Sequence, residues 1–86
     1  MSYRILWHDD VLKDLKKVDR GQAKIIIEKV DKYLVNNPYK LGKLLTGHLR
    51  GFYRYRIGKY RIIYTIEEAE LIILVLRVGK RDKIYK

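Results

Sequence analysis

Arginines alternate with tyrosines in the segment 53–57, which reads Tyr-Arg-Tyr-Arg-Ile. Such alternation is the period of a β-strand with two unlike faces, so Arg54 and Arg56 should share one face. Gly58-Lys59 then predicts a two-residue hairpin turn, because Gly supplies the positive φ that such turns need. The turn sets three pairs opposite each other: Ile57 with Tyr60, Arg56 with Arg61, and Arg54 with Ile63. Like charges directly opposite each other destabilise an antiparallel pair, and an anion bound between them would turn this repulsion into attraction.

A second basic group follows the last apolar run and consists of Lys80, Arg81 and Lys83. Sheet topology can bring this group close to the hairpin, which would make one basic surface from two stretches of sequence. The alternative is that the arginines are only the solvated face of an amphipathic hairpin. The hairpin pattern alone favours that alternative, and the second basic group argues against it.

The 86 residues predict a single small domain, 1–86. Its core is close to the lower size limit for folding without a disulfide or a structural metal. The net charge of +10 is concentrated in the second half: residues 1–38 hold 8 basic and 6 acidic side chains, and residues 39–86 hold 12 and 4. With eight tyrosines in the chain, such a surface fits nucleic acid, since phosphates meet cations and bases stack on rings. An acidic protein partner fits equally well.

Several classes of site have no motif in the sequence. There is no cysteine, no HExxH pair, no acidic cluster with ligand spacing and no Gly-rich phosphate loop, so we expect neither a metal nor a small-molecule cofactor. His8 and His48 are interpreted as surface or packing residues. No signal peptide is recognisable, and the longest apolar run, 71–76, is too short to span a bilayer. We therefore expect a cytoplasmic protein without a membrane partner.

The first half of the chain predicts a short strand and two helices. Residues 3–7 are β-prone, and a helical stripe follows with Asp9 or Asp10 as N-cap. The stripe consists of Val11, Leu12, Leu15 and Val18. A second stripe, capped by Asp19, comprises Ala23, Ile26, Ile27, Val30, Tyr33 and Leu34. Asn36-Asn37-Pro38 should end that helix, and the short linker between the helices predicts an antiparallel hairpin.

The second half predicts three antiparallel strands in a meander: the arginine strand, residues 60–66, and residues 71–78 after an acidic turn. The apolar run 71–76 favours a central strand covered on both faces. The expected fold is therefore α+β: an N-terminal strand, a two-helix hairpin, and a three-strand meander with the helices packed on one face of the sheet.

These residues resemble the RelE/ParE superfamily of toxins from toxin–antitoxin pairs, most closely its RelE-type branch of messenger RNA interferases. The resemblance covers nearly the whole chain and is carried by the helix pair and by four motifs. The motifs are Leu49-Arg50-Gly51 with the Tyr53–Arg56 strand, Tyr60-Arg61 with 62–64, Val78-Gly79-Lys80-Arg81, and Ile84-Tyr85.

The resemblance implies a RelE-like fold and ribosome-dependent, metal-independent cleavage of messenger RNA in the ribosomal A site, by attack of a ribose 2′-hydroxyl on its own phosphate. It also implies an acidic, RelB-like antitoxin as partner. By position, Arg61 matches the arginine that holds the scissile phosphate, Arg81 a second catalytic arginine, and Tyr85 a tyrosine that stacks on or orients a base. Arg54 and Arg56 match a basic pair that is often lysine in the family.

Two departures from the family pattern leave the general base open. An arginine guanidinium stays charged, so Arg54 and Arg56 should act as electrostatic clamps. Lys80 stands where many relatives carry His, which makes it the remaining candidate for a base or acid. Arg50, Lys83 and Lys43 are expected to contact RNA, and the side chains of Arg61 and Arg81 are expected to be exposed. The rival functions are a gyrase-inhibiting toxin of the ParE type and a non-catalytic relative that binds RNA or a partner.

Overall fold

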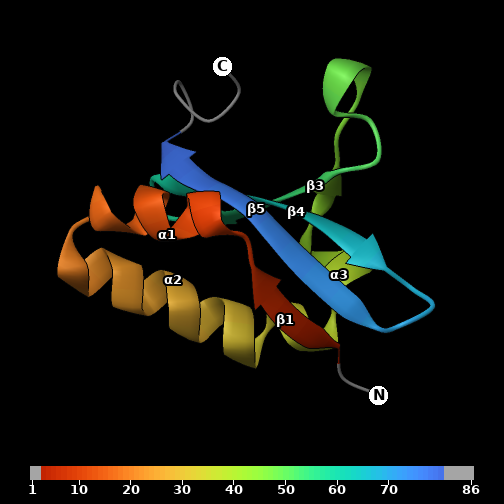
Figure 1. Cartoon of the computed structure of the whole chain (residues 1–86), viewed down its shortest axis with the longest axis horizontal. Coiled ribbons are helices and arrows are strands. Elements are labelled where there is room, and N and C mark those ends of the chain that lie inside the picture. Colours follow the sequence, from red (N-terminus) through yellow and green to blue (C-terminus); the bar gives the residue numbers. More distant parts are fainter. Residues whose placement is uncertain (1–2, 81–86) are drawn as a thin grey trace.

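Five strands form one sheet in the order β1-β5-β4-β3-β2, and the two main helices lie side by side on one of its faces (Figure 1). The computed structural model describes residues 3–80. The elements are β1 (Arg4–Trp7), α1 (Asp9–Lys16), α2 (Arg20–Lys32), η1 (Leu34–Asn36), α3 (Pro38–Leu41), β2 (Lys43–Leu44), η2 (Gly47–Leu49), β3 (Tyr53–Ile57), β4 (Tyr60–Glu67) and β5 (Ile72–Lys80). The predicted α+β class, with the helices on one face, is confirmed.

The hairpin of β3 and β4 has the predicted register, with Ile57 opposite Tyr60, Arg56 opposite Arg61 and Arg54 opposite Ile63. Gly58 in the turn has a φ of 58°, which a glycine adopts without strain. Because the turn contains only two residues, it fixes which side chains face each other along the whole hairpin.

The pairing of β1 with β5 is the main feature of the sheet that the expected meander did not include. β1 pairs parallel with β5, from Arg4 opposite Ile72 to Trp7 opposite Val75, and the short β2 pairs antiparallel with β3. β4 is therefore the central strand. The expectation that the run 71–76 is covered on both faces was wrong: Ile73 and Val75 are buried, whereas the alternate positions are partly exposed.

The core lies between the helix pair and the sheet. Its buried members come from α1, α2, η1 and the three long strands: Val11, Ile26, Val30, Leu34, Ile57, Ile62, Tyr64, Ile73, Val75 and Val78. Ile27 and Tyr33, which the helical stripe had included, are exposed. The buried stripe of α2 is therefore narrower than the sequence pattern suggests.

Two helix ends differ from the expectation. The N-cap of α1 is His8, whose Nδ1 accepts a hydrogen bond from the Asp10 amide at 3.0 Å, so Asp9 and Asp10 lie in the first turn. The second difference is at the C-terminal end of α2. This helix stops at Lys32, and Pro38 is the first residue of α3 instead of the residue that ends α2. Proline suits that position because the first amides of a helix have no intrahelical acceptor. The predicted cap of α2, Asp19, is confirmed by its bonds from the Gly21 and Gln22 amides.

Candidate functional site: an arginine face and its supports

Four cationic side chains share the sheet face that points away from α1 and α2. Lys43 lies opposite Arg54, and Arg56 lies opposite Arg61. Directly opposed residues share a face, and neighbours along a strand point to opposite faces. Since Ile57 and Ile62 belong to the core on the helix side, these four residues face the other way. We call Lys43, Arg54, Arg56 and Arg61 the arginine face.

The members of the arginine face differ in exposure. Arg56 is exposed and Arg54 is partly buried. Arg61 is only 7% exposed, so the expectation of an exposed side chain was wrong. It lies on the central strand β4, opposite Arg56 of β3 and Gly79 of β5.

Arg54 holds a buried donor. Its Nε is out of contact with solvent and has no hydrogen-bond partner among the described residues. Buried donors are paired in most proteins, and an unpaired one requires a reason. Because water does not reach this atom, an incoming anion would bond to it only after the Arg54 side chain moves.

Lys80 does not join the arginine face. It lies opposite Tyr60 at the end of β5, two residues after the core residue Val78, and so projects to the helix side. Its neighbour Gly79 is the residue opposite Arg61. The structure therefore separates Lys80 from Arg61 by the thickness of the sheet, contrary to the expectation of one catalytic group.

The other expected site residues have separate positions. Arg50 is exposed in the turn after η2, where its amide donates to the Gly47 carbonyl at 3.1 Å. Arg81, Lys83 and Tyr85 lie outside the described residues. His48 is exposed in η2 and His8 caps α1, in line with their interpretation as surface residues.

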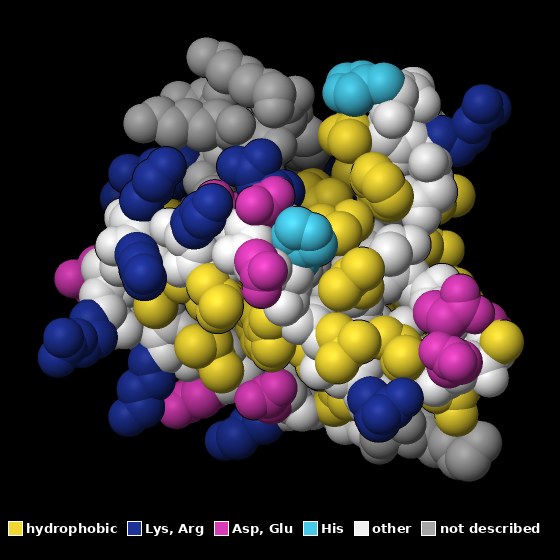
Figure 2. Space-filling view, in the orientation of Figure 1, with side chains coloured by type: hydrophobic (Ala, Val, Ile, Leu, Met, Phe, Trp, Pro, Cys, Tyr) yellow, Lys and Arg dark blue, Asp and Glu magenta, His cyan; other side chains and the backbone are white. Residues whose placement is uncertain are grey.

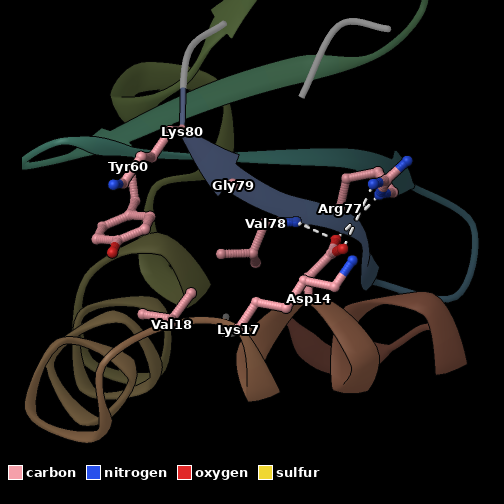
Figure 3. Close-up of a pocket in the computed structure, with 8 residues that line it drawn as sticks. All are labelled: Asp14, Lys17, Val18, Tyr60, Arg77, Val78, Gly79 and Lys80. Atoms are coloured by element: carbon pink, nitrogen blue, oxygen red, sulfur yellow. Dashed lines mark hydrogen bonds and ion pairs between the residues drawn. The ribbon is translucent and has the colours of Figure 1, made fainter. Parts of the chain in front are cut away.

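A buried carboxylate supports the end of β5, and the sequence reasoning missed it. Asp14 of α1 is 8% exposed, and its Oδ2 accepts from the Val78 amide and from Arg77 Nε, both at 2.9 Å (Figure 3). Its Oδ1 accepts from Arg77 Nη2 at 3.3 Å. The bond to Asp14 raises the pKa of the Arg77 guanidinium.

The reason for this contact lies in the unequal lengths of β1 and β5. Pairing ends at Trp7 opposite Val75, and the His8 amide makes the last bond, to the Val75 carbonyl. Beyond this point no strand pairs with this edge of β5 within the described residues. The Asp14 carboxylate accepts the hydrogen bond from the Val78 amide that a neighbouring strand would otherwise accept. A signal was present in the sequence: Asp14 stands three residues after Val11 and four before Val18, on the apolar side of α1.

Within residues 3–80, no group of three or more His, Cys, Asp or Glu side chains is placed to hold a metal ion. None of the helices in that range is long and apolar enough to cross a membrane.

Comparisons with known proteins agree on one family. A family model described as the ParE toxin of the type II toxin–antitoxin system parDE matches residues 5–85. The putative toxin RelE1 of Methanocaldococcus jannaschii is 33% identical over 89 residues, covering 100% of this chain and 98% of the relative. Toxin RelE of Mycobacterium tuberculosis is 31% identical over 74 residues, covering 86% and 76%.

Solved structures give the same result. A chain of the toxin–antitoxin complex RelBE2 from Mycobacterium tuberculosis matches with a TM-score of 0.90 at 27% identity, covering 94% of this chain and 100% of that one. A chain of the archaeal RelE–RelB complex from Pyrococcus horikoshii matches with a TM-score of 0.73 at 29% identity, covering 96% and 99%.

Proposed function

This chain belongs to the ParE/RelE family of toxins of type II toxin–antitoxin systems, and we propose that it is a ribosome-dependent endoribonuclease that cleaves messenger RNA. The observation that carries the proposal is the arginine face. Arg56 and Arg61 are directly opposed across the hairpin, and a phosphate bound between two guanidinium groups is attracted by both. Arg54 and the opposed Lys43 add two further cations to the same face.

The proposed reaction is attack of a ribose 2′-hydroxyl on its own 3′-phosphate, which breaks the bond to the next nucleotide's 5′ oxygen. Arg61 holds the scissile phosphate, and Arg54 and Arg56 stabilise the negative charge that grows in the transition state. Lys43, next to Arg54 across β2 and β3, and Arg50 bind flanking phosphates, as does Lys83. By the family resemblance, Arg81 supplies a second catalytic cation and Tyr85 stacks on a substrate base.

This set of residues binds a phosphate better than it moves protons. Guanidinium groups stay charged in proteins, and Lys80 lies on the other face of the sheet from Arg61. Positioning the 2′-hydroxyl in line with the leaving oxygen is by itself worth several kcal/mol of barrier, roughly 7–11 in well-oriented model systems. We propose that the ribosome supplies this geometry in its A site, so the protein is nearly inert on free RNA and acts in the cytoplasm.

The partner that restrains this activity is an acidic, RelB-like antitoxin. Relatives of this chain were solved as complexes with RelB, and a net charge of +10 on 86 residues favours an acidic protein.

The test of the cleavage proposal uses purified protein, ribosomes and a defined message, with primer extension to map the cut. Cleavage within the message on ribosomes, with little on naked RNA, is the expected result. Comparable turnover on naked and ribosome-bound message would contradict the role of the ribosome.

A second candidate function is favoured by the family model, whose description is that of a ParE toxin. A ParE-type toxin inhibits DNA gyrase by binding, without cutting RNA. A supercoiling assay with gyrase separates the two: inhibition of supercoiling without cleavage of the message would select this second function.

A further inference from the structure

A cavity of about 220 Å³ opens on the helix side of the sheet, between α1, the start of β4 and the end of β5 (Figure 3). Eight residues line it: Asp14, Lys17, Val18, Tyr60, Arg77, Val78, Gly79 and Lys80. The side chains of Val18 and Val78 supply apolar surface, and the ring of Tyr60 forms one wall. The cavity therefore offers a site for a flat or apolar group with a charged rim.

The charge at this rim is positive. Asp14 is bound by Arg77 and the Val78 amide, whereas Lys17 and Lys80 are exposed. A second hollow of about 300 Å³ adjoins the first, shares Tyr60 and Lys80 with it, and adds Lys59. Tyr60 thus lines both hollows, and lysines border each of them.

We propose that this cavity is a second RNA subsite, which takes one nucleotide of single-stranded RNA with its base against Tyr60 and its phosphates on Lys17 and Lys80. The inference rests on the proposed function and adds a binding site on the opposite face of the sheet. We call it the Tyr60 subsite.

The chemistry of the lining favours a nucleotide. Aromatic rings stack on any base, and lysine ammonium groups act as point charges for phosphate. A helical segment of a protein partner would need a row of apolar pockets along several turns, whereas the two hollows share a single aromatic residue, Tyr60.

The position of the Tyr60 subsite connects it to the arginine face. Arg61 pairs with Gly79, and the adjacent pair is Tyr60 with Lys80. The two faces therefore carry their RNA ligands back to back at the same end of the sheet. A single-stranded RNA that bent around this end of the sheet would pass from Arg61 to Tyr60, so the subsite would hold message next to the cleaved nucleotides.

The first experiment measures binding of a fluorescently labelled, short oligoadenylate RNA to the full chain at low salt, without ribosomes. Tyr60→Ala should weaken binding by about 5- to 150-fold, the effect of losing one stacked base, and Tyr60→Phe should bind like wild type. The matched control is Tyr33→Ala, because Tyr33 is an exposed tyrosine on the helix layer and lines neither hollow. Binding by Tyr60→Ala equal to wild type would overturn the proposal.

Tyr60 also packs against the core, so a surface variant gives an independent test. Lys17→Gln should weaken RNA binding and lower its salt dependence by about one phosphate contact. Lys13→Gln, in the helix α1 that Lys17 caps but outside the cavity lining, should change neither. Equal effects of the two lysine variants would count against the subsite.

Two further outcomes separate this inference from its rivals. If Tyr60→Ala and Lys17→Gln weaken binding of the antitoxin but leave RNA binding unchanged, the cavity is a binding site for the antitoxin and the proposal fails. If both variants lose RNA binding while wild-type protein does not cleave message on ribosomes, the subsite stands and the proposed function fails.

Discussion

At the scale of single residues, the arginine face combines an exposed cation with a nearly buried one. Arg56 meets solvent and Arg61 is 7% exposed, although they are directly opposed. A cation that is already desolvated acts more strongly on a phosphate than one in water. Arg61 therefore has both a structural and a catalytic part in the proposal, and substitutions of it must be tested for folding.

Arg61→Ala and Arg81→Ala should each lower cleavage on ribosomes by about 10²–10³-fold, the usual cost of losing a transition-state charge contact. Single-turnover cleavage measures this, and thermal unfolding checks the fold of each variant. Arg61→Lys keeps the charge and separates loss of charge from loss of packing. Arg20→Ala, on the exposed side of α2, should cleave like wild type. Wild-type cleavage by a folded Arg61→Ala, Arg81→Ala double variant would rule out the assigned site.

Gly42 is required because the hydroxyl of Tyr64 lies against it. Tyr64 is fully buried and donates to the Pro38 carbonyl at 2.6 Å. A Cβ on Gly42 would lie 1.7 Å from Tyr64 Oη. Gly42→Ala should therefore lower the free energy of unfolding by about 1–3 kcal/mol or more, as measured by urea denaturation. Gly21→Ala, in α2 and with only a 3.3 Å contact to Asp19, should be much less harmful.

The hydroxyl of Tyr39 is predicted to lose its proton at a higher pH than an ordinary tyrosine. Its hydroxyl donates to Glu68, and this bond raises the pKa of Tyr39 to about 12. Because the folded pKa is above the ordinary value of about 10, the contribution to stability is present below pH 10 and is lost as the pH rises toward 12. Alkaline titration of tyrosinate absorbance should lose this late component in Tyr39→Phe. In Glu68→Gln the same component should move to lower pH, and an unchanged curve would contradict the assignment.

At the scale of elements, the end of β5 depends on α1. Asp14 replaces the missing strand along the free edge of β5, and the residues it holds immediately precede Gly79 and Lys80. The position of the strand that borders Arg61 is thus coupled to the helix layer.

Asp14→Ala should release the Val78 amide and Arg77 together, at a cost of about 1–3 kcal/mol for the buried amide donor alone. Amide hydrogen exchange should accelerate at Val78 much more than at Val75, which lies where β5 still pairs with β1. Asp9→Ala, in the exposed first turn of α1, is the control. Equal acceleration at both amides would indicate global destabilisation instead of a local anchor.

At the scale of the whole molecule, the charge is unevenly distributed. In the view of Figure 2, lysine and arginine side chains gather over the side of the helix layer, with acidic side chains between them, and the arginine face carries further cations on the other side of the sheet. Steering of an acidic antitoxin by this field should make the association rate fall as salt rises, because the Debye length shrinks to about 10 Å at 0.1 M. Stopped-flow mixing at increasing salt measures this, and a constant rate would contradict steering.

The sequence alone determined the hairpin, the two helices and the N-cap of α2 at Asp19, but not the N-cap of α1, which is His8. The register of Arg56 with Arg61 follows from a two-residue turn and strict alternation, both of which act over a few residues. The same locality explains why Asp19 was identified as a cap. The family resemblance was also readable, because its motifs are short and occur in order.

Only the tertiary structure decided which of the site residues meet. Lys80 and Arg61 are both basic and both near strand ends, but the pairing of β4 with β5 puts them on opposite faces. The burial of Arg61, the anchoring of Val78 by Asp14 and the cavity beside Tyr60 all depend on contacts between segments far apart in the chain. Local periodicity contains no information on such contacts, because they are set by how the helix layer and the unequal strands β1 and β5 pack together.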